Sequence, residues 1–306
     1  MRRFAAILTL LMFTTAACEE KGDEAAARDA LPSAEYVKIN LPEGASKPGG
    51  ALEKVGELSP AYLTTLATAL TLNTGAAFVL ILVRVIVAFP VTSVEGDTLV
   101  WGPWHDDGDP GEYKLTARLS DEGVWEWALS GRRFGTAGTF QTVVSGFATP
   151  GRPRRGSGSF SIDFEVARAI DPASDGEGEL DVEYDLERDP VTLVMDAEKL
   201  APMPSGGSAL QTFHYDYSET RDHAGELGFA IYGDTDDPAS GWEMSDFRSR
   251  WQADGAGRAD VSVTGGDMGT GSATATECWD AHFLRTYYTD SVAWIPTEGS
   301  PSSCVF

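Results

Sequence analysis

Few residues in this chain have the types and spacing that enzymes or metal sites use. The four histidines lie in separate segments, and none belongs to an HExxH motif or another recognised metal-binding spacing. The stretches GSGSF and GTGSAT are glycine–serine turns and not the GxSxG elbow of a hydrolase. No phosphate-binding loop or dinucleotide fingerprint is present. We therefore predict no catalytic residue and no cofactor, and the sequence favours a protein that is not an enzyme.

Carboxylates gather in three loops that could have a chemical role. They read HDDGDPGE (105–112), DPASDGEGELD (171–181) and GDTDDPASGWE (233–243). Calcium binds such oxygen-rich loops, but none has EF-hand spacing, and Asp, Gly and Pro also form ordinary turns. Two carboxylates could also hydrolyse a glycosidic bond, although no particular pair stands out among 47 acidic residues. The metal ligands therefore stay unknown. A calcium-assisted surface adhesin and a hydrolase of cell-wall or extracellular polymer remain alternatives.

Composition limits the classes of partner. A formal charge of −24 repels phosphate backbones, so we expect no nucleic acid partner. Apolar residues make up 42% of the chain and include eight tryptophans, which is enough for a packed core. Tryptophans could also line a sugar- or lipid-binding surface, but we expect most of them in the core.

The first residues, MRRFAAILTLLMFTTAACEE, have the order of a secretory signal: a basic start, an apolar stretch and small residues. Small residues followed by Cys18 resemble the lipobox of bacterial lipoproteins, although Thr15 stands where that family usually has leucine. The resemblance implies a signal peptide at 1–17 and acylation of Cys18, and Glu19 favours the outer membrane. We therefore expect an exported protein, anchored by lipid on the periplasmic face or the cell surface. A plain secretory signal is the alternative.

Two cysteines remain, Cys278 and Cys304. In an oxidising compartment they are expected to form a disulfide that closes the C-terminal tail at 278–304. Two free thiols, or half of a metal site, are the alternatives.

Residues 18–56 are charged and rich in Ala, Gly and Pro, which predicts a flexible tether. Residues 57–306 are expected to form a single β-rich domain. It begins with an apolar helix at about 60–89, for which Ser59 is a good N-cap and Pro60 suits the first helical position.

The end of this helix, GAAFVLILVRVIVAFP, is the most apolar run after the signal. It is shorter than the roughly 18 apolar residues of a membrane span, and it contains Arg84. The acidic stretch that follows also lacks the basic residues of a cytoplasmic flank. We therefore expect the helix to be buried in the domain.

From Thr98 onward, apolar and polar residues alternate in short runs, for example EYKLTARL (112–119), FSIDFEV (160–166) and DVEYDLE (181–187). This period of two predicts half-buried strands. Their succession predicts a mainly β fold, an antiparallel meander that forms a barrel or a strongly curled sheet with the helix inside or against it. A two-sheet sandwich is the alternative. An outer-membrane barrel would need a polar lumen, where the apolar helix has no place.

The tail ECWDAHFLRTYYTDSVAWIPTEGSPSSC and the stretch from Pro90 to Trp104 look like parts of uncharacterised secreted lipoproteins from myxobacteria and their relatives. This resemblance implies no activity. The expected architecture is also loosely similar to the LolB lipoprotein carrier, which is an analogy of fold alone. We expect a monomeric binding or structural lipoprotein, with an apolar ligand or calcium as candidate ligands.

Overall fold

The computed structural model describes residues 23–42, 55–105, 107–152, 155–173, 177–200, 211–233, 241–304 and 306. Two α-helices are α2 (Pro60–Ala88) and α3 (Phe164–Ile170). Residues 23–30 are also helical. The strands are β1 (Ser93–Glu95), β2 (Thr98–Trp104), β3 (Gly111–Leu119), β4 (Trp125–Arg133), β5 (Gln141–Arg152), β6 (Arg155–Asp163), β7 (Glu179–Asp185), β8 (Val191–Leu200), β9 (Gln211–Glu219), β10 (Gly225–Gly233), β11 (Glu243–Trp251), β12 (Gly257–Gly265), β13 (Ser272–Trp279), β14 (Arg285–Asp290) and β15 (Glu298–Gly299). Short 3-10 turns are η1 (Gly266–Met268) and η2 (Pro301–Ser303).

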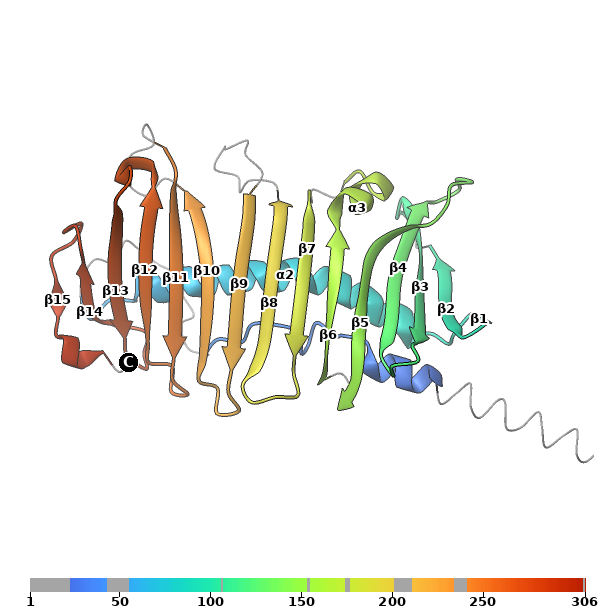
Figure 1. Cartoon of the computed structure of the whole chain (residues 1–306), viewed down its shortest axis with the longest axis horizontal. Coiled ribbons are helices and arrows are strands. Elements are labelled where there is room, and N and C mark those ends of the chain that lie inside the picture. Colours follow the sequence, from blue (N-terminus) through green and yellow to red (C-terminus); the bar gives the residue numbers. More distant parts are fainter. Residues whose placement is uncertain are drawn as a thin grey trace, which may run out of the picture. The chain divides into compact units, whose positions relative to one another are not determined.

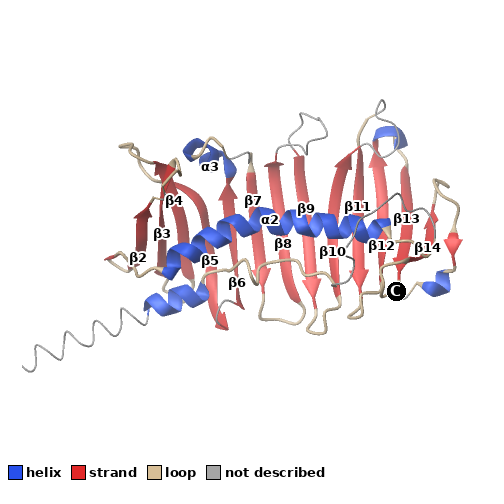
Figure 2. Ribbon diagram, turned by 180° about the vertical axis from the view of Figure 1, so that it is seen from behind, coloured by secondary structure: helices blue, strands red, loops and turns tan. Residues whose placement is uncertain are grey.

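The fifteen strands form an antiparallel meander in which spatial order follows chain order from β1 to β15 (Figure 1). The predicted mainly β meander is therefore confirmed. The predicted closure into a barrel or a strongly curled sheet is wrong, because the strand order has two ends, at β1 and β15. An open sheet can bury its apolar side by packing a helix on it instead of closing. The start of α2 lies along one side of the last strands (Figure 2) and packs on Ala259 and Trp279.

The chain divides into two compact units, which are described separately. Unit 1 contains Phe78–Glu179 and the described residues up to Tyr36. Unit 2 contains the described residues of Val37–Ala77 together with Leu180–Phe306.

In unit 1, the end of α2 supplies the apolar side chains of Leu80 and Val83, both fully buried. Period-two positions on the strands supply the rest of the core, including Leu115, Trp127 and Phe160. The Trp127 and Phe160 rings lie 6.0 Å apart. Among the described residues, no helix has both the length and the apolar character needed to cross a membrane.

The alternation FSIDFEV predicts one strand over 160–166, but the structure differs there. β6 ends at Asp163, and α3 begins at Phe164 because the Asp163 carboxylate accepts a hydrogen bond from the Val166 N–H at 2.9 Å. This is an N-cap, which an alternating pattern alone does not reveal. The short helix buries Ile170.

Part of the predicted tether is folded. In residues 23–36 of unit 1, Ala27 and Leu31 are buried, and the Arg28 guanidinium donates to the Phe89 carbonyl at 2.7 Å. In unit 2, the Asn73 side chain accepts from the Ile39 N–H and donates to the Ile39 carbonyl, each at 2.8 Å. Residues 23–42 therefore make defined contacts with α2 and with the segment that follows it. The remaining tether residues 18–22 and 43–54, and the signal at 1–17, lie outside the described residues.

The core of unit 2 forms where the start of α2 meets the last long strands. Tyr62 stacks on Phe283 with ring centroids 4.2 Å apart, and it also contacts Trp279. The Trp279 ring N–H donates to the Gly255 carbonyl at 2.9 Å, which satisfies its single donor inside the core.

Ser59 caps α2 as predicted, because its Oγ accepts from the Tyr62 N–H at 3.0 Å. The same hydroxyl donates to Glu277, which also accepts from the Ala61 N–H at 3.2 Å. A carboxylate therefore lies at the positive end of the helix. Arg285, only 2% exposed, pairs with Glu277 at 3.1 Å and with Glu298 at 3.4 Å.

Cys278 and Cys304 are disulfide-bonded, with Cα atoms 5.4 Å apart, as predicted. The bond fastens the C-terminal tail to β13. Beyond it, the Phe306 carbonyl accepts from Arg258 Nη1 at 3.3 Å.

Candidate functional site

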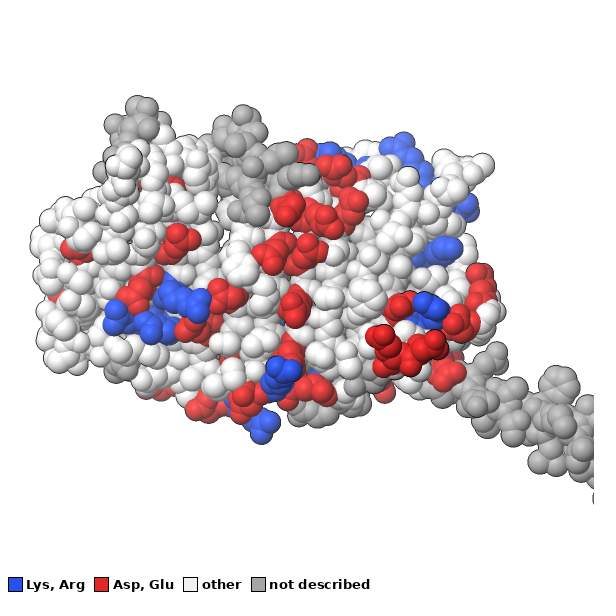
Figure 3. Space-filling view, viewed as in Figure 1, with Lys and Arg blue, Asp and Glu red and all other residues white. Residues whose placement is uncertain are grey.

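The candidate site is the polar face of unit 2, the side of β9–β13 opposite α2. Antiparallel register puts alternate residues of neighbouring strands on this face, for example Asp216, Gly228 and Arg248 in one row. The next strands continue with Arg258, Asp260 and Ser262 on β12, opposite Cys278, Thr276 and Thr274 on β13. Arginines and carboxylates gather over this part of the sheet in Figure 3. The residues between them point to α2 and form the core.

An open groove of about 570 Å³ crosses this face. Short side chains, those of Ala230, Ser262 and Thr274, form its floor together with Gly228. A larger residue than glycine would not fit at position 228, because a Cβ there would lie 2.3 Å from Asp216 Oδ1 and 2.7 Å from Arg248 Nη1. The missing side chain lets these two residues meet across β10, at 2.7 Å between Arg248 Nη1 and Asp216 Oδ2.

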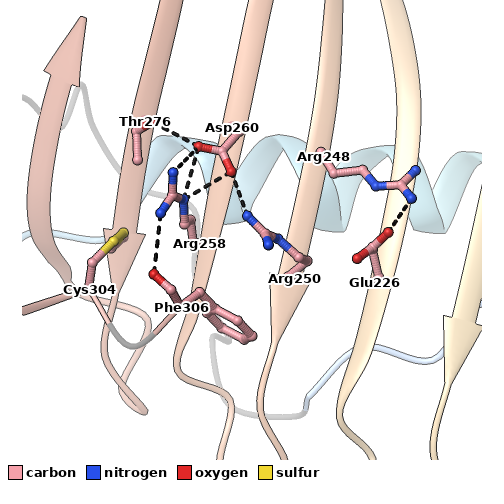
Figure 4. Close-up of polar contacts among 9 residues, drawn as sticks. Glu226, Arg248, Arg250, Arg258, Asp260, Thr276, Cys304 and Phe306 are labelled. Atoms are coloured by element: carbon pink, nitrogen blue, oxygen red, sulfur yellow. Dashed lines mark hydrogen bonds and ion pairs between the residues drawn. A yellow bond between two sulfur atoms is a disulfide. The ribbon is translucent and has the colours of Figure 1, made fainter.

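Three further ion pairs border the groove (Figure 4). Arg248 also binds Glu226 on β10. Asp260 is shared by two arginines, with Arg250 Nη2 and Arg258 Nη2 each 2.6 Å from one of its oxygens. Thr276 Oγ1 donates to the same carboxylate at 2.8 Å. Burial alone would raise the pKa of Asp260, but hydrogen bonds from Arg258 and Thr276 and the nearby guanidinium charges hold it below the ordinary value.

The groove lining is negative. It contains three carboxylates, those of Asp216, Asp246 and Asp260, and one guanidinium, that of Arg248, so its formal charge is 1 − 3 = −2. With the bordering Arg250, Arg258 and Glu226 included, the charge is 3 − 4 = −1. Asp246 is exposed, and its carboxylate makes no hydrogen bond or ion pair within the described part of the chain. His214, at the edge, lies 2.6 Å from Asp196 through its Nδ1. The groove can therefore accept hydrogen bonds and positive charge.

The predicted chemical residues do not converge on this groove. Cys18 lies outside the described residues, as do positions 106, 174–176 and 234–240 of the acidic loops. Two of the described acidic residues there stabilise turns: Asp109 accepts from the Gly111 N–H at 2.7 Å, and Asp171 accepts from the Ala173 N–H at 2.9 Å. Others pair with arginine, as Glu112 does with Arg132 and Glu177 with Arg168. Within the described ranges, no three His, Cys, Asp or Glu side chains gather as a metal site would require.

Glu219 is a polar centre that the sequence pattern did not indicate. Its carboxylate is nearly buried and accepts from the Asn40 amide at 2.9 Å and the Tyr217 hydroxyl at 2.8 Å, while His223 Nδ1 lies 2.7 Å away. Burial acts to raise the pKa of Glu219, but these hydrogen bonds outweigh it and lower the pKa below its ordinary value. The group holds residue 40 against β9, so its role is structural.

The sequence pattern also did not indicate the ion pairs that Arg248, Arg250 and Arg258 form with Asp216 and Asp260. The strand EMSDFRSRW places Asp246, Arg248 and Arg250 on one face by its period of two, which is the signal that could have revealed them. The partners Asp216 and Asp260 come from neighbouring strands, and their pairing depends on a register that this pattern does not contain.

Comparison of the chain with protein-family models, with curated proteins and with solved structures finds no match, so the fold and the groove are interpreted from their own geometry.

Proposed function

We propose that this protein is a lipid-anchored, extracytoplasmic binding domain, and that the groove of unit 2 holds a cationic segment of a partner polypeptide. The observation that carries the proposal is the exposed, negatively charged groove with a floor of short side chains. A side chain of lysine or arginine would find the free Asp246 carboxylate and the hydroxyls of Ser262 and Thr274 as acceptors.

The geometry favours this role over the other functions considered. Carriage of an apolar ligand needs an enclosed apolar cavity, whereas this groove is open to solvent and carries charged side chains, and in unit 2 the start of α2 already packs on the apolar Ala259 and Trp279. A hydrolase of glycosidic bonds needs, as its general acid, a carboxyl group with a raised pKa in a cleft, whereas the pKa of the groove residue Asp260 is lowered. The Glu277 pKa is raised because that side chain is buried beside the start of α2, away from the groove lining.

Membrane anchoring rests on the lipobox-like run that ends at Cys18. We expect wild-type protein to enter the detergent-rich phase in phase partitioning and to incorporate labelled palmitate, because several acyl chains hold a protein stably at a membrane. The Cys18→Ser variant should lose the label and move to the aqueous phase. A variant that partitions like the wild type would remove the anchor from this proposal.

Binding at the groove can be tested by calorimetry with a short synthetic peptide of alternating lysine and glycine. We expect binding that weakens as sodium chloride is added, because screening reduces attraction between exposed charges. Ser262→Trp should weaken binding by about tenfold, equivalent to about 1.4 kcal/mol, because the indole fills the groove without changing any charge.

Two asparagine variants separate the groove from the general acidity of the chain. Asp246→Asn and Asp121→Asn each remove one exposed carboxylate, but only Asp246 lines the groove. We expect Asp246→Asn to weaken peptide binding more than Asp121→Asn does. Equal effects of the two, together with an unchanged affinity of Ser262→Trp, would show that the peptide binds only to diffuse charge and would overturn the groove as the site.

A further inference from the structure

A second groove lies on unit 1, on the side of β2–β6 that faces away from the buried Leu115, Trp127 and Phe160. It has a volume of about 530 Å³. Two neighbouring cross-strand rows line it. One row is formed by Thr116, Ala128, Ser145 and Ser161, and the other by Thr98, Arg118, Glu126, Phe147 and Ser159.

The first row gives the groove a low floor with hydroxyl groups. Thr116, Ala128, Ser145 and Ser161 pair in direct register across β3, β4, β5 and β6. Because each side chain is short, an extended molecule can lie across the strands along this row. The threonine and serine hydroxyls can each donate or accept a hydrogen bond.

The second row forms a wall with an unusual combination of groups. Phe147 pairs with Glu126 across β4 and β5. It is 54% exposed, and its neighbours in the two rows are mostly polar. Glu126 in turn binds Arg118 at 2.5 Å between Oε2 and Nη2. An aromatic ring open to solvent therefore stands directly beside two planar, hydrogen-bonding groups.

Carbohydrate has the matching chemistry. A sugar ring has one face of C–H groups, which packs on an aromatic ring, and a rim of hydroxyls, which bind arginine, carboxylate and hydroxyl side chains. The charges of Arg118 and Glu126 cancel, so the lining attracts neither anions nor cations strongly. One exposed phenyl ring among hydroxyls is also too little apolar surface for a lipid chain.

We propose that this groove binds a neutral polysaccharide. One sugar ring packs on Phe147, and the hydroxyls of neighbouring sugars form hydrogen bonds with Arg118, with Glu126 and with the threonine and serine side chains of the first row. The site is independent of the peptide groove proposed for unit 2, since the two grooves have no lining residue in common. Each can therefore fail without the other.

Native gel electrophoresis of the full chain in non-ionic detergent tests the proposal. The gels contain hydroxyethyl cellulose, xylan, galactomannan, laminarin or glycogen, and migration is compared with a gel that has no polymer. We expect at least one of these polysaccharides to retard the wild-type protein. Phe147→Ala should lower the affinity obtained from retardation by about tenfold, because it removes the stacking surface, and Phe147→Trp should keep it.

Phe134→Ala is the matched control, because Phe134 is also 54% exposed in unit 1 but does not line the groove. We expect it to be retarded like the wild type. Circular dichroism and thermal unfolding of each variant check that the fold is kept. The proposal is overturned if none of the five polysaccharides retards the wild type, if Phe147→Ala is retarded equally, or if Phe134→Ala loses retardation to the same degree.

Discussion

Replacing Arg285 with alanine is expected to lower the free energy of unfolding by about 3–5 kcal/mol, the range for removing one partner of a buried ion pair. The Arg285 side chain is 2% exposed, and its partner Glu277 is almost as deeply buried. Without the guanidinium, the Glu277 carboxylate stays at the start of α2 with hydrogen bonds but no opposite charge. Urea unfolding followed by tryptophan fluorescence measures the difference.

The pH dependence of this loss gives a sharper test. Burial raises the pKa of Glu277, which hydrogen bonds and Arg285 counteract only in part. A raised pKa in the folded state means a contribution to stability that is present below the ordinary pKa of 4.5 and is lost as the pH rises through the folded value. Removal of Arg285 should raise that pKa further. The deficit of Arg285→Ala is therefore expected to be largest at neutral pH and to shrink in acid.

Arg188→Ala provides a control, since the Arg188 side chain is 82% exposed in its pair with Asp185. Exposed pairs contribute about 0–1 kcal/mol, so this variant should unfold nearly like the wild type. Adding Glu277→Gln to Arg285→Ala should recover stability at neutral pH, because it removes the unpaired charge. If Arg285→Ala were no less stable than Arg188→Ala, the buried pair would not hold α2 to the last strands.

Loss of the disulfide is expected to have an effect of similar size. Cys278 and Cys304 are separated by 26 positions in the sequence, and the chain-entropy relation gives about 3.5 kcal/mol for a loop of that length. The double variant Cys278→Ala with Cys304→Ala should therefore unfold at lower urea concentration than the oxidised wild type. Reduced wild-type protein should approach the double variant.

Cys18→Ser serves as the control for thiol chemistry, because it removes a cysteine that the disulfide does not use. It should leave the urea midpoint unchanged. Intact mass after alkylation without reductant should show no labelled thiol at positions 278 and 304. Labelling at both positions, or equal midpoints for the oxidised and double-variant proteins, would contradict a stabilising bond.

The strands of the meander and the start of α2 could be predicted because they depend on residues close together in the sequence. A period of two places Leu115 and Ala117 on the buried side of β3 wherever that strand lies in the sheet. The cap at Ser59 likewise depends on the residues that follow it. The disulfide followed from a count of cysteines and from the compartment that the lipobox-like signal implies.

What could not be predicted depends on residues far apart in the chain. Alternation is the same in an open sheet and in a closed one, so it does not reveal that β1 and β15 are two separate edges. The groove on unit 2 requires Asp216, Gly228 and Arg248 in one row, and this row exists only once the registers of two strand pairs are known. The folded segment at 23–42 has few large apolar residues, and its order comes from contacts such as Asn73 with Ile39.

The chain-order meander has a consequence for how the protein folds. Successive strands can pair as hairpins as soon as both have been made, since each pairing closes only a short loop and costs little chain entropy. The start of α2 is different, because its partner Glu277 lies 218 positions further along the chain. During vectorial synthesis or export, the first long helix therefore remains without its final anchor until almost the last strand has emerged. A nascent chain stalled before β13 would show hairpin structure but an unprotected N-terminal turn in α2, as measured by hydrogen exchange.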